Sequence, residues 1–328
     1  MSTHFLLLAA WAPIIACGLT FLLTKLMLSS SVFSKIQDVP NSRSLHDRPI
    51  PRVGGLAIML GALTAWHLLE SPVTRWLSIA VMILMVLSFL DDLKDLSAKW
   101  RLLGHMLVAF GFIKLGLAPM STYWALVFLL GVVWMTNLYN FMDGANGLAG
   151  GMAVLGFGFY ALVAGLSGDL NFAFMNLVIV GSSIAFLYFN FGQAKVFMGD
   201  AGSIPLGFLS GAIGLLGWQK GLWPLWFPVV IFSSFILDAT VTLLKRLFRG
   251  ERIWDAHREH YYQRLIRMGM SHQKMALIEY GLMLISGAVA MGVLHQRLPY
   301  MIGLLSMCLF LKLFMMYRVD KIWQQYVK

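Results

Sequence analysis

Long apolar runs alternate with short polar connections along the whole chain. A helix of about 20 apolar residues crosses the hydrocarbon core of a bilayer, and such runs recur throughout the sequence. The pattern predicts an all-α, polytopic integral membrane protein, a helical bundle of about eleven transmembrane helices. The expected segments are residues 4–28, 54–69, 74–90, 102–117, 122–140, 147–166, 171–190, 202–217, 222–247, 276–294 and 298–317. We therefore expect a single transmembrane domain over residues 1–328.

The composition agrees with a membrane protein and disfavours other classes. Of the 328 residues, 59% are hydrophobic and 12% are charged, whereas soluble domains are about 25% charged. In a soluble protein the formal net charge of +10 would suggest a nucleic-acid partner. In a membrane protein it reflects basic cytoplasmic loops and attraction to anionic lipid. We therefore expect membrane lipid, and no nucleic acid, as a partner.

The placement of basic residues predicts how the chain crosses the membrane. With the N-terminus outside, most of the 25 lysine and arginine residues fall in connections on the cytoplasmic side. Because basic loops stay cytoplasmic, we expect the N-terminus outside and the C-terminus in the cytoplasm. The expected cytoplasmic loops are residues 29–53, 91–101, 141–147, 191–202 and 248–275, and the polar motifs described below lie in or beside them.

One apolar run ends in the acidic motif Asp91-Asp92-x-x-Asp95, followed by Lys99. Adjacent carboxylates repel each other, and the repulsion is poorly screened near lipid. A divalent cation relieves it, and such oxygen ligands suit Mg²⁺, or Mn²⁺ as an alternative. Asp95 and Lys99 have the spacing of an ordinary helical ion pair. We therefore expect Asp91 and Asp92 to be the functional acids and Asp95 to be structural.

A ladder of polar side chains ends another apolar run. Asn137, Asn140 and Asp143 follow each other at one-turn spacing, so they share one face of a helix. The next residues, Asp143-Gly144 and Asn146-Gly147, are also typical of a simple turn. A simple turn explains the glycines but not the ladder, which favours a ligand-binding role.

Two further loops combine glycine with charge. In residues 40–58, His46, Arg48 and Arg52 are candidates for binding an anionic ligand. Gly54-Gly55 is also typical of close helix packing. In residues 190–207, Asp200 begins a glycine-rich apolar segment. The helix start there is a candidate phosphate site, but Asp200 has the alternative role of a helix N-cap.

The last cytoplasmic loop holds His257, Arg258 and His260 close together. Cationic side chains in such a cluster suit phosphate binding. An alternative is an amphipathic interfacial helix, with Tyr261 and Tyr262 at the level of the lipid headgroups. The sequence leaves both readings open.

In chain order, these stretches resemble the polyprenyl-phosphate N-acetylhexosamine-1-phosphate transferase family. The resemblance rests on Pro-x-x-Arg…Pro-x-Pro-Arg-x-Gly-Gly at 40–55, Asp91-Asp92 with Lys99, the ladder that ends in Asp143-Gly144-x-Asn146-Gly147, Asn190…Phe197-Met198-Gly199-Asp200-x-Gly202-Ser203, and the histidine loop. It implies that undecaprenyl phosphate attacks the β-phosphorus of a UDP-N-acetylhexosamine and releases UMP, with Mg²⁺ as cofactor. It also implies a multi-pass protein of the bacterial inner membrane, with the active site at the cytoplasmic face.

The resemblance also implies roles for single residues. Asp91, Asp92, Asp143 and Asp200 are the implied catalytic acids. Asp92 and Asp200 are the implied metal ligands, and Asp91 orients or deprotonates the lipid phosphate. Phe197 is expected to stack on uracil. The remaining implied substrate-binding residues are Arg52, Lys99, Asn137, Asn140, Asn146, Asn190, His257, Arg258 and His260.

Departures from the peptidoglycan branch narrow the expectation. That branch resembles DDxxK, with Asp where this chain has Asn146 and a triple histidine in the last loop. Here Lys94 lies one residue early, Asp95 stands at the lysine position, and the loop reads His-Arg-Glu-His. The chain looks like the branch that initiates O-antigen or another surface polysaccharide. The sugar would then be GlcNAc or a 6-deoxy-N-acetylhexosamine.

Two other functions compete with the transferase. Asp91-Asp92-x-x-Asp95 also fits the DDxxD motif of an intramembrane prenyltransferase, but a second acid-rich helix of that form is missing from the sequence. A transporter would place ionisable residues near the middle of the membrane, whereas these acids lie at the ends of apolar runs. Glycine spacing in 147–166 and 202–217 is compatible with a homodimer.

Overall fold

The computed structural model describes residues 3–33, 36–40, 45–69, 71–94, 96–252, 254–255 and 257–327, with the side chains of 3–8, 72 and 92–94 outside that description. Two sequence-based expectations fall on this remainder. The pairing of Asp95 with Lys99 lies outside the described residues, and so does the side chain of Asp92.

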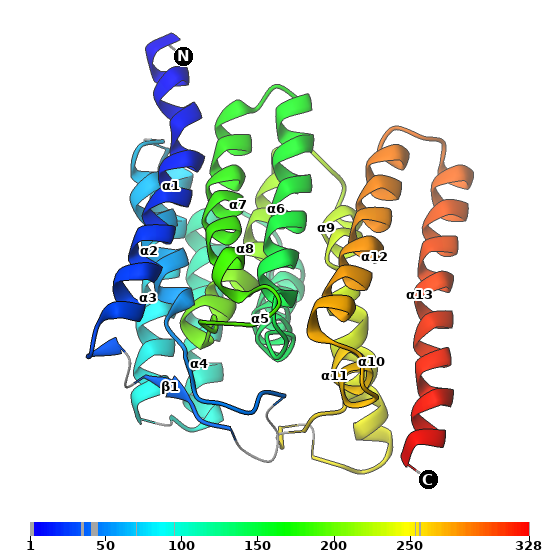
Figure 1. Ribbon diagram of the computed structural model, residues 1–328. Coiled ribbons are helices and arrows are strands. Elements are labelled where there is room, and N and C mark those ends of the chain that lie inside the picture. The colour runs from blue at the N-terminus through cyan, green and yellow to red at the C-terminus, as the bar shows by residue number, and fades with distance from the viewer. Residues whose placement is uncertain are drawn as a thin grey trace.

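The described part of the chain is predominantly helical (Figure 1). Its helices are α1 (Thr3–Ser29), α2 (Gly54–His67), α3 (Pro72–Lys94), α4 (Ala98–Gly116), α5 (Thr122–Phe141), α6 (Leu148–Leu166), α7 (Leu170–Asn190), α8 (Asp200–Gln219), α9 (Trp226–Ile231), α10 (Ser233–Phe248), α11 (Tyr261–Arg267), α12 (His272–Val293) and α13 (Leu298–Val327). Two short antiparallel strands, β1 (Gln37–Asp38) and β2 (Ile50–Pro51), pair in the loop between α1 and α2. Helices dominate because a backbone in lipid must satisfy its hydrogen bonds within its own segment.

Among the described residues, 8 helices are long and apolar enough to cross a membrane, namely α1, α3, α5, α6, α7, α8, α12 and α13. Each of the eleven expected segments contains helix, so the polytopic helical class is confirmed. The expected count is not, because α2 is a shorter apolar helix and α4 falls outside this set. The segment 222–247, expected as one span, is divided into α9 and α10 at the fully buried Phe232.

Helices α7 and α8 lie at the centre of the bundle. Helix α7 packs against α1, α2 and α6, while α8 packs against α2, α3, α5 and α6. Helix α8 is the most buried of the candidate spans and α13 the least buried. Helix α13 lies at the edge of the bundle beside α12 (Figure 1). Asp200, the first residue of α8, is therefore held in the middle of the fold, and α5, which carries the polar ladder, packs directly against α8.

Glycine allows these central helices to approach closely. A Cβ atom on Gly55 would lie 2.6 Å from the carbonyl oxygen of Met198 and overlap the backbone of Gly202. In the same way, Gly156 packs against the ring of Phe232. Gly55, Gly156 and Gly202 thus serve contacts between helices of one chain, and the homodimer stays a prediction.

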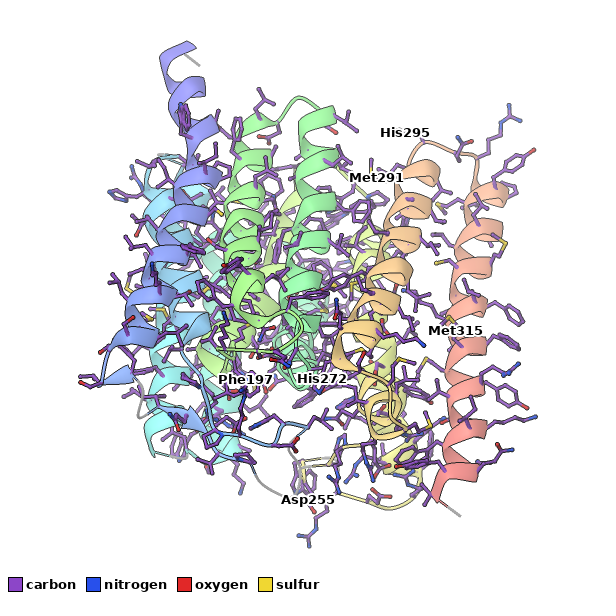
Figure 2. The ribbon with its side chains drawn as sticks, viewed as in Figure 1. Phe197, Asp255, His272, Met291, His295 and Met315 are labelled. Atoms are coloured by element: carbon purple, nitrogen blue, oxygen red, sulfur yellow. The ribbon has the colours of Figure 1, made fainter. Side chains whose placement is uncertain are left out.

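The two ends of the bundle differ in their polar content. The N-terminus lies at one end, together with His295 and Met291, and the C-terminus lies at the other (Figures 1 and 2). Phe197, Asp255 and His272 lie towards the C-terminal end (Figure 2). The two termini therefore lie at opposite ends of the bundle, as the charge distribution predicts. The polar motifs lie at the same end as the C-terminus.

Candidate active site

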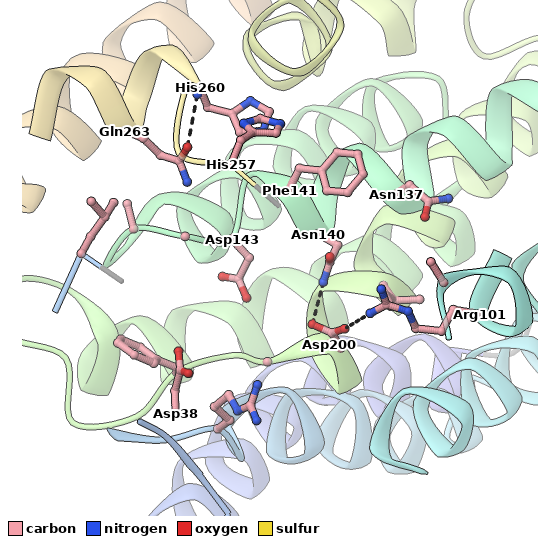
Figure 3. Close-up of a pocket in the computed structure, with 18 of the residues that line it drawn as sticks. Asp38, Arg101, Asn137, Asn140, Phe141, Asp143, Asp200, His257, His260 and Gln263 are labelled. Carbon is pink, nitrogen blue, oxygen red and sulfur yellow. Dashed lines mark hydrogen bonds and ion pairs between the residues drawn. The ribbon is translucent and has the colours of Figure 1, made fainter. Parts of the chain in front are cut away.

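A cavity of about 570 Å³ opens at the polar end of the bundle. Its walls come from the loop around β1, from α4 and α5, from the loop that precedes α8, and from the segment that leads into α11 (Figure 3). Predicted residues in its lining are Arg52, Asn137, Asn140, Asp143, Asn190, Phe197, Asp200, His257 and His260. Four of the five sequence motifs thus meet in one space.

Backbone hydrogen bonds join the two glycine-containing loops. The N–H of Phe197 donates to the carbonyl of Pro51 (2.8 Å), and the carbonyl of Phe197 accepts from Gly54 (2.9 Å). The N–H of Gly55 donates to Met198 (2.8 Å). Residues more than 140 positions apart therefore form one rigid wall of the cavity.

Asp200 points into the cavity because of the turn before it. Gly199 is the N-cap of α8 and has a φ of 69°, a left-handed conformation that glycine adopts without strain. A Cβ atom at Gly199 would also lie 3.1 Å from the carbonyl oxygen of Arg52. Asp200 is the first residue of α8 and does not cap it, so the N-cap alternative for Asp200 is wrong.

The carboxylate of Asp200 is held from two sides (Figure 3). Nδ2 of Asn140 donates to Oδ1 of Asp200 (2.8 Å) and also to Oγ of Ser203 (3.0 Å). Nη1 of Arg101 lies 3.5 Å from Oδ2 of Asp200. The amide of Asn140 therefore orients one carboxylate oxygen of Asp200, and the guanidinium group of Arg101 orients the other.

Arg101 links Asp200 to the acidic motif at the end of α3. Its Nη1 lies 2.9 Å from Oδ2 of Asp91, whose other oxygen accepts the N–H of Leu96 (2.7 Å). Asp91 is buried, with 7% of its surface exposed. Asp91 thus lies behind Arg101, whose side chain lines the cavity.

The polar ladder has the geometry that its spacing predicts. Asn137, Asn140 and Asp143 all line the cavity. The pKa of the Asp143 carboxyl is raised well above that of an ordinary aspartate, because it is desolvated and because Asp200 and Asp38 place negative charge near it. A carboxyl group whose pKa is strongly raised by burial and by neighbouring carboxylates is typical of a functional site.

Phe197 and His46 meet on the wall opposite the ladder. Their ring centroids are 4.9 Å apart, and the rings pack edge to face. The Nε2 atom of His46 lies 3.3 Å from Oδ2 of Asp38, and its Nδ1 lies 2.9 Å from the carbonyl oxygen of Arg48. Phe197 is therefore fixed in orientation at the edge of the cavity.

The histidine loop supplies the remaining wall. His257 and His260 lie with their ring centroids 4.9 Å apart. The following helix, α11, buries Tyr261 and Tyr262, with 5% and 1% of their surfaces exposed. The hydroxyl of Tyr262 donates to the carbonyl of Phe141 (3.0 Å). Tyr261 and Tyr262 therefore pack inward, and the interfacial position of α11 stays a prediction.

Some expected substrate contacts are absent from the described lining of the cavity, namely Lys99, Asn146 and Arg258. Lys99 is exposed. Asn146 donates to the carbonyl of Gly192 (2.7 Å) and helps to hold the loop after α7. Asn190 does line the cavity, but its amide accepts from Gly147 (2.7 Å) and donates to Val196 (2.9 Å). Within this structure Asn146 and Asn190 brace loops.

Several of the residues that line the cavity were not predicted from the sequence. Arg101 and His105 lie one turn apart on α4 and both face the cavity, as do Asp38 and Gln263. The i,i+4 spacing of Arg101 and His105, directly after the acidic motif, is the sequence feature that could have identified these two residues. Lys99 and Arg101 are equally plausible from the sequence, and the docking of α4 decides that Arg101 faces inward.

Comparison with known proteins identifies relatives of this chain. The profile described as glycosyl transferase family 4 matches residues 74–217. The chain is 34% identical to a Bacillus subtilis protein named "Probable undecaprenyl-phosphate N-acetylglucosaminyl 1-phosphate transferase", over 74% of this chain and 73% of the relative. It is 29% identical to the undecaprenyl-phosphate alpha-N-acetylglucosaminyl 1-phosphate transferase of Yersinia pestis, over 85% and 82% of the two chains. The corresponding Escherichia coli K12 protein is 28% identical over 90% and 88%.

The matched profile spans the acidic motif, the polar ladder and Asp200, and the similarity to the relatives extends over most of the chain. The chain therefore belongs to glycosyl transferase family 4, with the polyprenyl-phosphate N-acetylhexosamine-1-phosphate transferases.

Proposed function

We propose that this protein transfers an N-acetylhexosamine 1-phosphate from a UDP-sugar to undecaprenyl phosphate and releases UMP. The observation that carries the proposal is the single cavity at the end of the bundle. It gathers the carboxylates of Asp143 and Asp200 with the guanidinium groups of Arg52 and Arg101. The names of the relatives support the same chemistry. They do not favour a prenyltransferase or a transporter.

The cavity suits a phosphorylated ligand in size and in charge. Its volume of about 570 Å³ falls within the range of roughly 300–1,000 Å³ that is usual for small-molecule sites. Arginine is well suited to bind phosphate through paired N–H groups. Because the cavity lies where the helices end, a soluble nucleotide and a lipid-borne phosphate would both reach it.

In the proposed reaction, the main role of the protein is to place charged groups around the reacting phosphates. An oxygen of the lipid phosphate bonds to the β-phosphorus of the UDP-sugar, and the bond from that phosphorus to the bridging oxygen breaks as UMP leaves. Phosphoryl transfer depends largely on alignment and on neutralising the phosphate oxygens. Arg52 and Arg101 would supply positive charge, and Asp91 would orient the lipid phosphate through its contact with Arg101.

The donor set fits the proposed magnesium ion. Magnesium is usually held by one or two carboxylates, together with water and substrate phosphates. The described residues contain no group of three or more acids, histidines or cysteines placed to hold a metal by themselves. We propose Asp200, which lines the cavity, and Asp92 as the ligands that the family resemblance implies, with Mn²⁺ as a substitute. Bound Mg²⁺ would neutralise the pyrophosphate and stabilise departing UMP.

The finer assignment follows from the sequence. The His-Arg-Glu-His loop and Asn146 favour the initiation of O-antigen or another surface polysaccharide, with GlcNAc or a 6-deoxy-N-acetylhexosamine as the sugar. The basic loops favour an active site that faces the cytoplasm, and the bacterial relatives support a location in the bacterial inner membrane.

One assay tests the proposal. Purified protein in detergent is incubated with Mg²⁺, undecaprenyl phosphate and radiolabelled UDP-GlcNAc, with other UDP-N-acetylhexosamines in parallel. We expect label in the lipid phase together with an equal amount of UMP. If none of the UDP-N-acetylhexosamines yields a lipid product, the proposed function is wrong.

A further inference from the structure

A buried carboxylate behind the cavity controls the histidine loop. Asp238 lies on α10 with 6% of its surface exposed. Its Oδ1 accepts from the backbone N–H of Tyr261 (2.9 Å) and from Oγ1 of Thr242 (3.2 Å), and it lies 3.1 Å from Nδ1 of His260. Its Oδ2 accepts from the N–H of Tyr262 (3.0 Å). Asp238 therefore holds the start of α11 and the imidazole at the same time.

These contacts define the tautomer of His260. An ionised carboxylate only accepts hydrogen bonds, and Asp238 already accepts from two backbone amides, so we assign a proton to Nδ1 of His260. In the neutral ring, Nε2 is then left with a lone pair. Nε2 makes no hydrogen bond within the described part of the chain, and His260 lines the cavity.

Aromatic neighbours keep the ring in place. His260 stacks on Phe141, with centroids 6.3 Å apart and planes at 24°, and on Tyr262, at 5.8 Å and 16°. Phe141 ends the helix that carries the polar ladder (Figure 3). The direction of Nε2 is therefore set both by a hydrogen bond to Asp238 and by packing.

The neighbouring histidine has the opposite arrangement. Nδ1 of His257 accepts the backbone N–H of Glu259 (3.3 Å). Because Nδ1 accepts, the proton of the neutral ring of His257 lies on Nε2. The two adjacent imidazoles thus offer one hydrogen-bond acceptor and one donor.

We propose that Asp238 is a positioning residue that fixes His260 so that its Nε2 accepts a hydrogen bond from a hydroxyl or amide N–H of the nucleotide sugar. This inference deepens the proposed function and rests on it for the identity of the ligand. A phosphate oxygen carries no proton to donate, so an imidazole acceptor is suited to the sugar rather than to the pyrophosphate. Asp238 would act through His260, with no contact to the substrate.

Asp238→Asn tests this link, because it keeps the shape but turns one acceptor of hydrogen bonds into a donor. We expect KM for UDP-GlcNAc to rise about 10- to 100-fold, the usual range when a residue that orients a ligand-binding histidine is lost. KM for undecaprenyl phosphate should change little. In the double variant Asp238→Asn with His260→Ala, KM for UDP-GlcNAc should stay close to that of His260→Ala alone. Both changes remove the same interaction, the hydrogen bond that Nε2 of His260 accepts from the substrate.

Asp320→Asn is the matched control. Asp320 on α13 also contacts the α11 region, accepting from the hydroxyl of Tyr261 (3.0 Å) and from Arg264 (2.8 Å), but it does not touch His260. Asp320→Asn should lower thermal stability and leave KM for UDP-GlcNAc unchanged, both alone and when combined with His260→Ala. An unchanged KM for UDP-GlcNAc in Asp238→Asn, or multiplication of its effect with that of His260→Ala, would overturn the proposal.

A measurement without substrate separates this inference from the proposed function. In the wild-type protein labelled with ¹⁵N-histidine, NMR should show Nδ1 of His260 protonated, with the signal assigned by its loss in His260→Ala. If Nε2 carries the proton instead, the positioning role of Asp238 is wrong even where transferase activity is normal. If the tautomer is as expected but no UDP-N-acetylhexosamine is used, the proposed function fails and the positioning role stands, with another ligand.

Discussion

Asn140 and Asp200 are joined across the cavity, with Nδ2 of Asn140 2.8 Å from Oδ1 of Asp200 although 60 positions separate them in the chain. The amide comes from the end of α5 and the carboxylate from the start of α8. Because α5 and α8 pack directly against each other, this contact holds the proposed metal ligand in one orientation.

Replacing Asn140 with leucine should therefore impair catalysis more than folding. Leucine has a similar size but cannot donate to Asp200, so we expect turnover to fall about 10- to 100-fold. Asn176→Leu is the matched control, because Asn176 is buried on α7 and donates only to the carbonyl of Phe172 (2.8 Å). Equal turnover in the two variants would contradict the role given to Asn140.

Asp200→Asn should abolish transfer without loss of folded protein. The substitution removes the negative charge that would bind the proposed Mg²⁺, so we expect turnover to fall by at least about 100-fold. Chelation of the metal with EDTA should abolish the activity of the wild-type enzyme. Asp169→Asn serves as control, since Asp169 caps α7 and pairs with Lys220 (2.8 Å) outside the cavity. Radiolabel transfer over a Mg²⁺ series measures both, and near-normal activity of Asp200→Asn would refute the metal assignment.

Arg101→Gln should leave two carboxylates without their shared cation. Arg101 lies 2.9 Å from Asp91 and 3.5 Å from Asp200, so its loss removes neutralising charge beside the expected phosphates. We expect a reduction of about 100-fold in kcat/KM. Lysine at this position should recover part of the activity, whereas Arg75→Gln, which removes an exposed arginine at the start of α3, should have no effect. Full activity of Arg101→Gln would exclude this role.

Gly55→Ala should destabilise the fold itself. The added Cβ would lie 2.6 Å from the carbonyl oxygen of Met198, against backbone that cannot easily move. Overpacking of this kind costs about 1–3 kcal/mol of unfolding free energy. Thermal unfolding in detergent should show a lower Tm for Gly55→Ala but not for Gly158→Ala, because a Cβ on Gly158 would meet nothing within 4 Å. An unchanged Tm for Gly55→Ala would mean that α2 and α8 can separate freely.

His257 should contribute a pH dependence to stability. Burial, His260 and Arg246 lower the pKa of His257 from 6.5 to about 4. Between these values the unfolded chain binds a proton that the folded protein does not, so stability falls as the pH drops from 6.5 towards about 4. The decline in Tm over this window should be shallower in His257→Gln than in wild type. Parallel curves for the two proteins would show that His257 is not held neutral.

Much of the architecture could be read from the chain itself. Apolar runs predict helices because lipid offers no other partner to the backbone, and each expected run contains helix. The spacing of Asn137, Asn140 and Asp143 placed them on one helical face, and all three line the cavity. Period and composition are local properties, so they survive without knowledge of the fold.

Other features depended on contacts between distant segments. That Arg101 rather than Lys99 faces the cavity follows from how α4 docks beside α3 and α5, and nothing in the local pattern separates the two. The inward packing of Tyr261 and Tyr262 likewise follows from the carboxylate of Asp238, more than 20 positions earlier. The sequence by itself determined the helices and the chemistry that the chain carries. Tertiary structure decided which side chains meet, because those contacts depend on how helices far apart in the sequence pack together.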